Sequence, residues 1–207
     1  LTQTDALGNS TSYSYDRAQR SMTVTTAEGV TMTTVHNREG QTHSVTDGNG
    51  NTTTYAYDAN GNLVRTDTPL THSTAEYDKA NRLVRTTDAN GVAVDYEYDA
   101  ANRLLTRTLD PSGLALSTHY GYDAKGRQLT TTDPRGTVTA IGYDLNGRVL
   151  TQTVDPAGLA LTTSYTYNEA GDVLTVTSPG GTVTKYVYDE LGRRKEEHLD
   201  PNGLDLV

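Results

Sequence analysis

Aspartate and arginine recur together along the chain, four residues apart. The five pairs are Asp78/Arg82, Asp99/Arg103, Asp123/Arg127, Asp144/Arg148 and Asp189/Arg193. Carboxylate and guanidinium groups at a constant spacing could form an array that binds a polar ligand. The same spacing suits an ion pair that braces one turn of the chain, a contact worth about 0–1 kcal/mol when it is exposed. We favour the ion pair, and the ligand array is the alternative.

Two segments resemble the start of a calcium-binding loop, Asp47–Asn51 and Asp58–Asn62. The EF-hand loop also requires glycine at its sixth position and glutamate at its twelfth. The first segment has Thr52 and Asp58 at these positions, and the second has Pro69 at its twelfth. We therefore predict two ordinary turns, with a weak cation site as the alternative.

Other catalytic patterns give no candidate. The histidines occupy different positions of the repeat described below and never occur as H-E-x-x-H or H-x-x-x-H, so we predict no metal site; they are His36, His43, His72, His119 and His198. No serine lies in a G-x-S-x-G context, and there is no phosphate-binding loop. Carboxylates are plentiful but belong to turns, so no glycosidase pair can be identified. We predict no cofactor and no enzymatic activity.

These residues belong to a repeated phrase, Y-D-x-x-G-R-L followed by a threonine-rich run. Copies begin at Tyr15, Tyr57, Tyr77, Tyr98, Tyr122, Tyr143, Tyr167 and Tyr188, and a divergent copy begins near Val35, so the spacing is 20–24 residues. A fixed period in this range indicates a repeat architecture. We predict one array of about nine copies over residues 1–207, as an excerpt of a longer chain.

A position that recurs in every copy is expected to serve the structure that the copies build together. The residues to which we assign this structural role are Tyr15, Asp16, Tyr57, Asp58, Gly61, Tyr77, Asp78, Arg82, Tyr98, Asp99, Arg103, Tyr122, Asp123, Gly126, Arg127, Tyr143, Asp144, Gly147, Arg148, Tyr167, Gly171, Tyr188, Asp189, Gly192 and Arg193.

Each copy predicts two β-strands joined by tight turns. In the copy Asn81–Asp99, residues 83–87 are apolar and β-branched without helical period, and residues 92–98 form a second such run. Asp88–Gly91 lies between them, where Asn-Gly is expected to supply the positive φ angles of a hairpin turn. The array should therefore be an all-β, continuous antiparallel meander.

Tyrosines occur in pairs two residues apart, such as Tyr120/Tyr122 and Tyr165/Tyr167, so both rings of a pair should share one face of a strand. We expect successive copies to stack the rings into a ladder, joined by Leu63, Leu83, Leu104, Leu129 and Val149. A fully buried tyrosine would contribute about 4–6 kcal/mol gross. Exposed rings could instead stack on sugars, which leaves carbohydrate binding open. Tyrosine is preferable to phenylalanine where the ring edge reaches water or a hydrogen-bond partner.

Composition limits the partners. The hydrophobic fraction is 34%, with 14 Tyr and no Phe, Trp or Cys, and the net charge is −9. An acidic chain is a poor partner for nucleic acid or an anionic membrane, because both need a basic face. No run of 18 apolar residues and no signal-peptide pattern occurs, so we expect no membrane insertion by this segment.

The Y-D-x-x-G-R-L phrase resembles the RHS/YD-repeat family, which includes bacterial Rhs toxins, toxin-complex C components and teneurins. The resemblance covers the whole chain. It implies a β-strip that spirals into a hollow shell, in a secreted or cell-surface protein, with a C-terminal toxin or effector domain enclosed. Asp200–Leu204 looks like the D-P-x-G-L of the Rhs cleavage region, but Asp110–Leu114 and Asp155–Leu159 repeat the string, which favours a turn.

The leading hypothesis is a shell segment whose partners are the rest of its polypeptide and an enclosed toxin or effector. The alternative is an extracellular adhesion or glycan-binding array. A polysaccharide-degrading enzyme is a third hypothesis, which a degradation screen would test. A toxin-like domain beyond the repeats would favour enclosure, and a lectin-like module or an anchor would favour adhesion.

An open antiparallel strip leaves unpaired edge strands, which pair readily with a neighbouring chain. We therefore predict that the isolated fragment self-associates edge to edge or is marginally stable. Sedimentation and thermal unfolding test this. A monomer with a cooperative, high-temperature transition would contradict the prediction.

Overall fold

The computed structural model describes residues 1–200, and its regular structure consists of 19 β-strands. The described residues contain no helix long and apolar enough to cross a bilayer. The predicted all-β class is confirmed.

The chain divides into two compact units, which we describe separately. The first comprises residues 1–96 and 109–115, and the second comprises residues 97–108 and the chain from residue 116 onward. The strands are β1 (Thr2–Thr4), β2 (Ser10–Asp16), β3 (Ser21–Thr25), β4 (Thr31–His36), β5 (Thr42–Thr46), β6 (Thr52–Tyr57), β7 (Leu63–Asp67), β8 (His72–Tyr77), β9 (Leu83–Thr87), β10 (Ala93–Tyr98), β11 (Leu104–Leu109), β12 (Leu116–Tyr122), β13 (Gln128–Thr132), β14 (Val138–Tyr143), β15 (Val149–Val154), β16 (Leu161–Tyr167), β17 (Val173–Thr177), β18 (Val183–Tyr188) and β19 (Arg194–Asp200).

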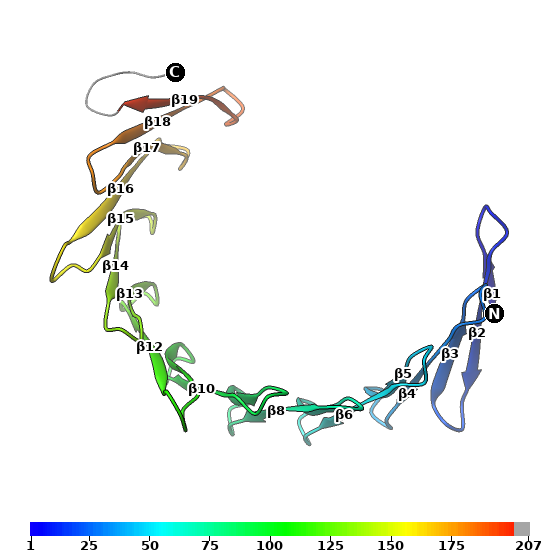
Figure 1. Cartoon of the computed structure of the whole chain (residues 1–207). Helices are drawn as coiled ribbons and strands as arrows, with labels where there is room; N and C mark the ends of the chain where they lie inside the picture. Colours follow the sequence, from blue (N-terminus) through cyan, green and yellow to red (C-terminus); the bar gives the residue numbers. More distant parts are fainter. Residues whose placement is uncertain (201–207) are drawn as a thin grey trace. The chain divides into compact units, whose positions relative to one another are not determined.

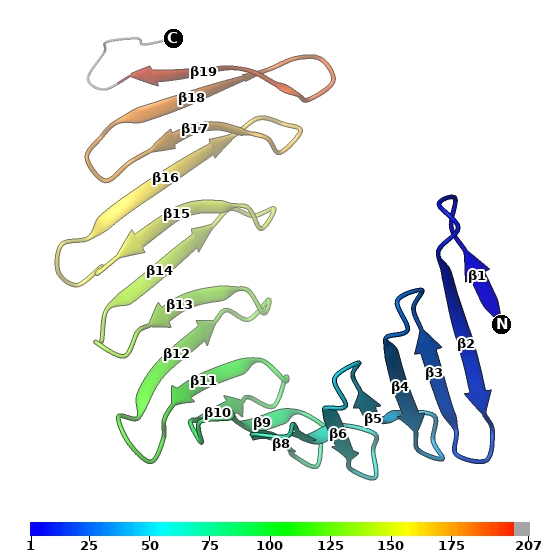
Figure 2. The same ribbon diagram turned by 45° about the vertical axis from the view of Figure 1, so that its right-hand side comes forward.

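Each unit is an antiparallel meander. In the first unit every strand from β1 to β9 pairs with the next strand in sequence. In the second unit the same holds from β12 to β19. Within each unit the hairpins lie side by side, with turns at both margins of the sheet (Figures 1 and 2). The predicted two-strand repeat is confirmed.

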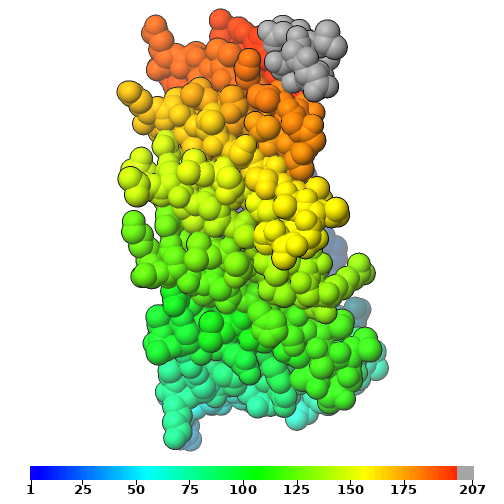
Figure 3. All heavy atoms as spheres, turned by 90° about the vertical axis from the view of Figure 1, so that its left-hand side faces the viewer, coloured from blue at the N-terminus to red at the C-terminus, as the bar shows by residue number. Residues whose placement is uncertain are grey.

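The sheet is one layer thick, and no described residue is buried. Figure 3 shows one face of the second unit, with turns that project at its margins. No tyrosine ring is fully buried. The rings are half-buried or, for Tyr15, 62% exposed, so the stabilisation computed for complete burial does not apply.

The two faces of the sheet differ in chemistry. Side chains alternate between the faces along each strand, and directly paired residues share a face. Tyr165 pairs with Val176, whereas Thr166 pairs with Thr175, so Tyr165 lies on one face of β16, and Thr162 and Thr166 lie on the other. On the threonine face the paired hydroxyls hydrogen-bond across strands, at 2.9 Å in Thr153–Thr162. Half-exposed hydroxyls therefore stabilise the face that carries no aromatic ring.

Most turns share one hairpin geometry. At Asp58 the backbone N–H donates to the Asn62 carbonyl at 3.0 Å, and the Gly61 N–H donates back to the Asp58 carbonyl at 3.1 Å. Gly61 has φ 89°, a left-handed conformation that glycine adopts without steric cost. This is a type I turn closed by a glycine bulge.

The Asn-Gly expectation needs correction in one detail. At Asp88–Gly91 only the glycine has positive φ, 81°, and Asn90 does not. The bulge geometry requires a single left-handed residue, which Asn81 (φ 66°) and Asn102 (φ 64°) supply in copies that lack the glycine. Asparagine tolerates this conformation better than most residues.

The D-P-x-G-L strings at Asp110 and Asp155 form hairpin turns, as predicted. In the second unit, the Asp155 carboxylate accepts the Leu159 N–H at 3.0 Å, and Asp155 and Ala160 have φ 53° and 50°. A Cβ on Gly158 would overlap the Asp155 carboxylate, which explains the glycine. The third copy, Asp200–Leu204, extends outside the described residues.

Candidate functional site

The recurring aspartates close hairpin turns with their side chains. The Asp123 Oδ1 accepts the backbone N–H groups of Lys125 and Arg127, both at 2.9 Å. The carboxylates of Asp47 and Asp58 make the equivalent bonds, from Asn49 and Asn51 and from Asn60 and Asn62. The two calcium-loop look-alikes are therefore turns, as predicted. No group of three His, Cys, Asp or Glu residues suited to a metal ion occurs in residues 1–200.

The five predicted Asp–Arg ion pairs are present. The nitrogen–oxygen distances are 2.7 Å for Arg82–Asp78, 2.6 Å for Arg103–Asp99, 2.7 Å for Arg127–Asp123, 2.6 Å for Arg148–Asp144 and 2.8 Å for Arg193–Asp189. In each pair the arginine follows the left-handed turn residue and immediately precedes the next strand, where its side chain reaches its own aspartate. One carboxylate oxygen thus accepts backbone N–H groups, and the other accepts the guanidinium.

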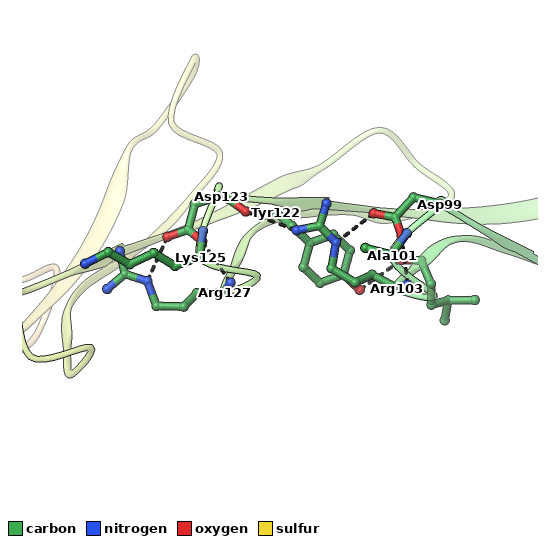
Figure 4. A network of polar contacts seen from close by, with 8 residues as sticks. Asp99, Ala101, Arg103, Tyr122, Asp123, Lys125 and Arg127 are labelled. Carbon is green, nitrogen blue, oxygen red and sulfur yellow. Dashed lines mark hydrogen bonds and ion pairs between the residues drawn. The ribbon is translucent and has the colours of Figure 1, made fainter.

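The arginine also binds the following copy, which the sequence analysis missed. Arg103 donates from Nη1 to the Asp123 carbonyl at 3.0 Å, and its guanidinium lies 4.9 Å from the centre of the Tyr122 ring (Figure 4). Arg127 contacts Tyr143 and the Asp144 carbonyl in the same way, at 4.6 Å and 3.1 Å. The guanidinium therefore links two copies through an ion pair, a hydrogen bond and a cation–π contact.

Arg148 makes a third link of this kind, with Tyr167 at 4.7 Å and the Asn168 carbonyl at 3.1 Å. Each of these three rings is thus contacted by a guanidinium of the preceding copy. This differs from the predicted ladder, in which tyrosines stack on one another. The Asp-x-x-x-Arg spacing predicts the ion pair from the sequence. It does not predict the tyrosine that also contacts the arginine, because Tyr167 lies 19 residues from Arg148.

The second tyrosine of a copy makes one further contact. Its hydroxyl donates to the carbonyl of the first residue of the preceding strand, at 2.7 Å for Tyr167 to Val149. The other such bonds are Tyr57–Thr42 (2.9 Å), Tyr77–Leu63 (3.4 Å), Tyr122–Leu104 (2.8 Å), Tyr143–Gln128 (2.8 Å) and Tyr188–Val173 (2.9 Å). This confirms the prediction that tyrosine replaces phenylalanine where the ring edge has a partner.

The end of the backbone ladder explains this hydroxyl. Between β15 and β16 the pairing runs from Thr151–Ser164 to Val154–Leu161, and Val149 and Tyr167 lie beyond it. The tyrosine hydroxyl supplies a donor where the strands no longer pair. Gln128, not the predicted Leu129, takes this strand-start position in its copy, and Leu129 is 36% exposed.

Two of the copies that lack the arginine have a neutral amide at the same position, Gln41 and Asn62. Gln41 donates from Nε2 to the Gly61 carbonyl at 3.0 Å, and Asn62 hydrogen-bonds the Asn81 side chain. We call this set of links from one turn to the next the turn seam. Its members are Gln41, Asn62, Arg103, Arg127 and Arg148 with their partners in the following copy.

Hydrogen bonds hold the turn carboxylates ionised. The pKa of Asp78 and the pKa of Asp189 lie below the ordinary value because the backbone N–H of the arginine four residues on donates to the carboxylate, with the guanidinium second. At Asp144 partial desolvation would raise the pKa, but the N–H and guanidinium of Arg148 outweigh it. These carboxylates are occupied acceptors, poorly suited to act as general acids near neutral pH.

The site is therefore a structural link that recurs from copy to copy of an antiparallel sheet. This arrangement places the chain among the repeat proteins whose copies together form a wall. The sequence profile of the teneurin YD-shell family matches residues 8–204, and the chain belongs to this family. It is a shell segment of the RHS/YD-repeat type.

Solved structures support the fold. Crystal structures of TcdB2–TccC3–TEV and of TcdB2–TccC3 match 98% and 95% of the chain, with TM-scores of 0.57 and 0.58 and 17% identity. The chain spans only 14% and 15% of the length of those matched chains. A search of curated proteins gave no match.

Replacement of Tyr167 by phenylalanine removes the hydroxyl that reaches Val149. We expect Y167F to lower the free energy of unfolding by about 1 kcal/mol, the usual net worth of such a bond. Tyr165→Phe is the control on the same strand, and it should change stability by less than about 0.5 kcal/mol. Urea denaturation measures both. Equal losses in the two variants would contradict the role of the Tyr167 hydroxyl.

Acid should weaken the turns. A carboxylate whose folded pKa is depressed contributes stability above its unfolded pKa, near 3.8, and loses it as the pH falls through the lower folded value. We expect the urea concentration at the midpoint of unfolding to decrease as the pH is lowered through this acidic range. Asp144→Asn should make the fall shallower while keeping the turn, because Asn168 already caps an equivalent turn with its side-chain oxygen. An unchanged pH profile in D144N would refute this.

Proposed function

We propose that the chain is part of a wall that encloses a C-terminal toxin or effector domain of the same polypeptide, in an exported protein. The observation that carries the proposal is the turn seam, in which side chains of one copy hold the next copy in the same manner three times over. A barrier requires continuity, and the seam adds side-chain links to the backbone ladder.

Family membership supports the same function, since the YD-shell segment matches nearly the whole chain. The wall acts by exclusion: it keeps the cargo from proteases and from its targets until release. The partners in this account are the remainder of the polypeptide and the cargo, together with edge strands of a second copy. The proposal includes no nucleic-acid partner, because the chain carries a net charge of −9.

The recurring residues have structural roles in this proposal, and none is catalytic. The carboxylates that could serve a glycosidase already accept hydrogen bonds from their own turns. Carbohydrate binding, the alternative, needs free aromatic faces. Guanidinium groups occupy one face of Tyr122, Tyr143 and Tyr167, which leaves these rings less available to sugars.

Limited proteolysis of the complete protein tests enclosure. Arg127→Ala combined with Arg148→Ala opens two links of the seam, and we expect the region C-terminal to this chain to be cleaved several-fold faster. The control combines Arg107→Ala with Arg135→Ala, which removes the same charge without touching the seam. Equal cleavage in the parent protein and both double variants, with the C-terminal region accessible throughout, would overturn enclosure.

A further inference from the structure

The turn after β2 departs from the other turns of its margin. Asp16 pairs with Ser21 and Tyr15 with Met22 in regular register, and the turn contains no glycine. Arg20 instead adopts φ 54°, a conformation that costs free energy in a residue with a side chain. Departures of this kind from the local rules of a fold concentrate at functional positions.

A hollow of about 500 Å³ lies between this turn and the turn at residues 37–40. Its lining includes Arg17, Arg20, Arg38 and His36. Arg20 is fixed by a hydrogen bond of 3.1 Å from its Nε to the His36 carbonyl. The His36 Nδ1 is shielded from solvent and has no hydrogen-bond partner among the described residues.

The three guanidinium groups have no carboxylate partner in the described part of the chain. Among residues 1–200 none of them forms an ion pair, whereas Arg103, Arg127 and Arg148 are each paired with their own aspartate. Asp16, the one carboxylate in the lining, accepts the N–H groups of Ala18 and Gln19 at 2.8 and 3.1 Å. The hollow thus concentrates positive charge in a chain whose net charge is −9.

The neighbouring hollow shows that this charge is not a general property of the margin. It has a volume of about 680 Å³ and lies between the turns at residues 37–41 and 57–61. Glu39, Asp58 and His43 line it, with no arginine or lysine. Similar backbone surroundings therefore carry opposite charge in adjacent copies.

We propose that the hollow formed by Arg17, Arg20, Arg38 and His36 binds a phosphate or sulfate monoester. A guanidinium presents paired N–H donors that match two oxygens of an oxyanion. Three of them suit a tetrahedral group with several oxygens better than a carboxylate, which has two. The volume leaves room for the organic part of the ester. This binding is independent of enclosure.

Titration of the isotope-labelled fragment with inorganic phosphate, followed by NMR, tests the proposal. We expect saturable shifts confined to residues 15–40. Arg17→Gln and Arg38→Gln should each weaken binding about tenfold, since a charge-assisted hydrogen bond is lost. Both side chains are exposed and hold no other described residue in an ion pair, so the fold should survive. Arg38→Lys should restore part of the affinity.

Arg135→Gln is the matched control, because Arg135 is an exposed arginine on an ordinary turn at the other margin. It should bind phosphate as the parent does. Two further ligands distinguish the source of the ester: glucose 6-sulfate, and vesicles that contain phosphatidate. Absence of shifts in residues 15–40, or equal weakening by R135Q and R38Q, would overturn the proposal.

Discussion

A sheet with no second layer must derive its stability along its own length. No described residue is fully buried, so each apolar side chain is removed from water only in part, and burial contributes less per residue than in a two-layer domain. The backbone ladder and the contacts between neighbouring copies remain. In such arrays stability is approximately a sum of copy and nearest-neighbour terms. The link from an arginine to its own aspartate, the next tyrosine and the next carbonyl is therefore the interaction on which the wall depends.

Each component of that link is weak alone. An exposed ion pair is worth about 0–1 kcal/mol, and a cation–π contact at an exposed site about 0.5–1 kcal/mol. Their combination on one guanidinium matters because a single ordered side chain then serves three partners, and its conformational entropy is lost once. The aspartate side chain also serves more than one partner, because it closes its turn with one oxygen and binds the arginine with the other. The tyrosine ring likewise receives the guanidinium, while its hydroxyl extends the strand pairing.

The sequence was sufficient for the local structure and insufficient for the links between copies. The repeat period, the turn-forming residues and the alternation of side chains along each run predicted the strands, the hairpins and the Asp–Arg pairs. All of these depend on residues within about five positions of one another in the sequence. The contact of Arg103 with Tyr122 and Asp123 depends on strand register, which a bulge shifts between Gly121 and Tyr122. The tyrosine ladder was predicted from the spacing of the rings within each copy, which does not reveal their charged neighbours. In the structure Tyr122, Tyr143 and Tyr167 each contact a guanidinium of the preceding copy.

The residues that most resembled catalytic groups are those that the fold leaves least available. Asp123 accepts two backbone N–H groups and a guanidinium, and its pKa is depressed because these bonds outweigh its partial desolvation. A group in this state neither donates a proton near neutral pH nor has a free oxygen for a substrate. The same reasoning identifies the exception. Where the copy at Tyr15 breaks the pattern, Arg17 and Arg20, with Arg38 of the next copy, line one hollow and form no ion pair within residues 1–200. In a repeat array, function is therefore better sought at the copy that departs from the pattern than in the pattern itself.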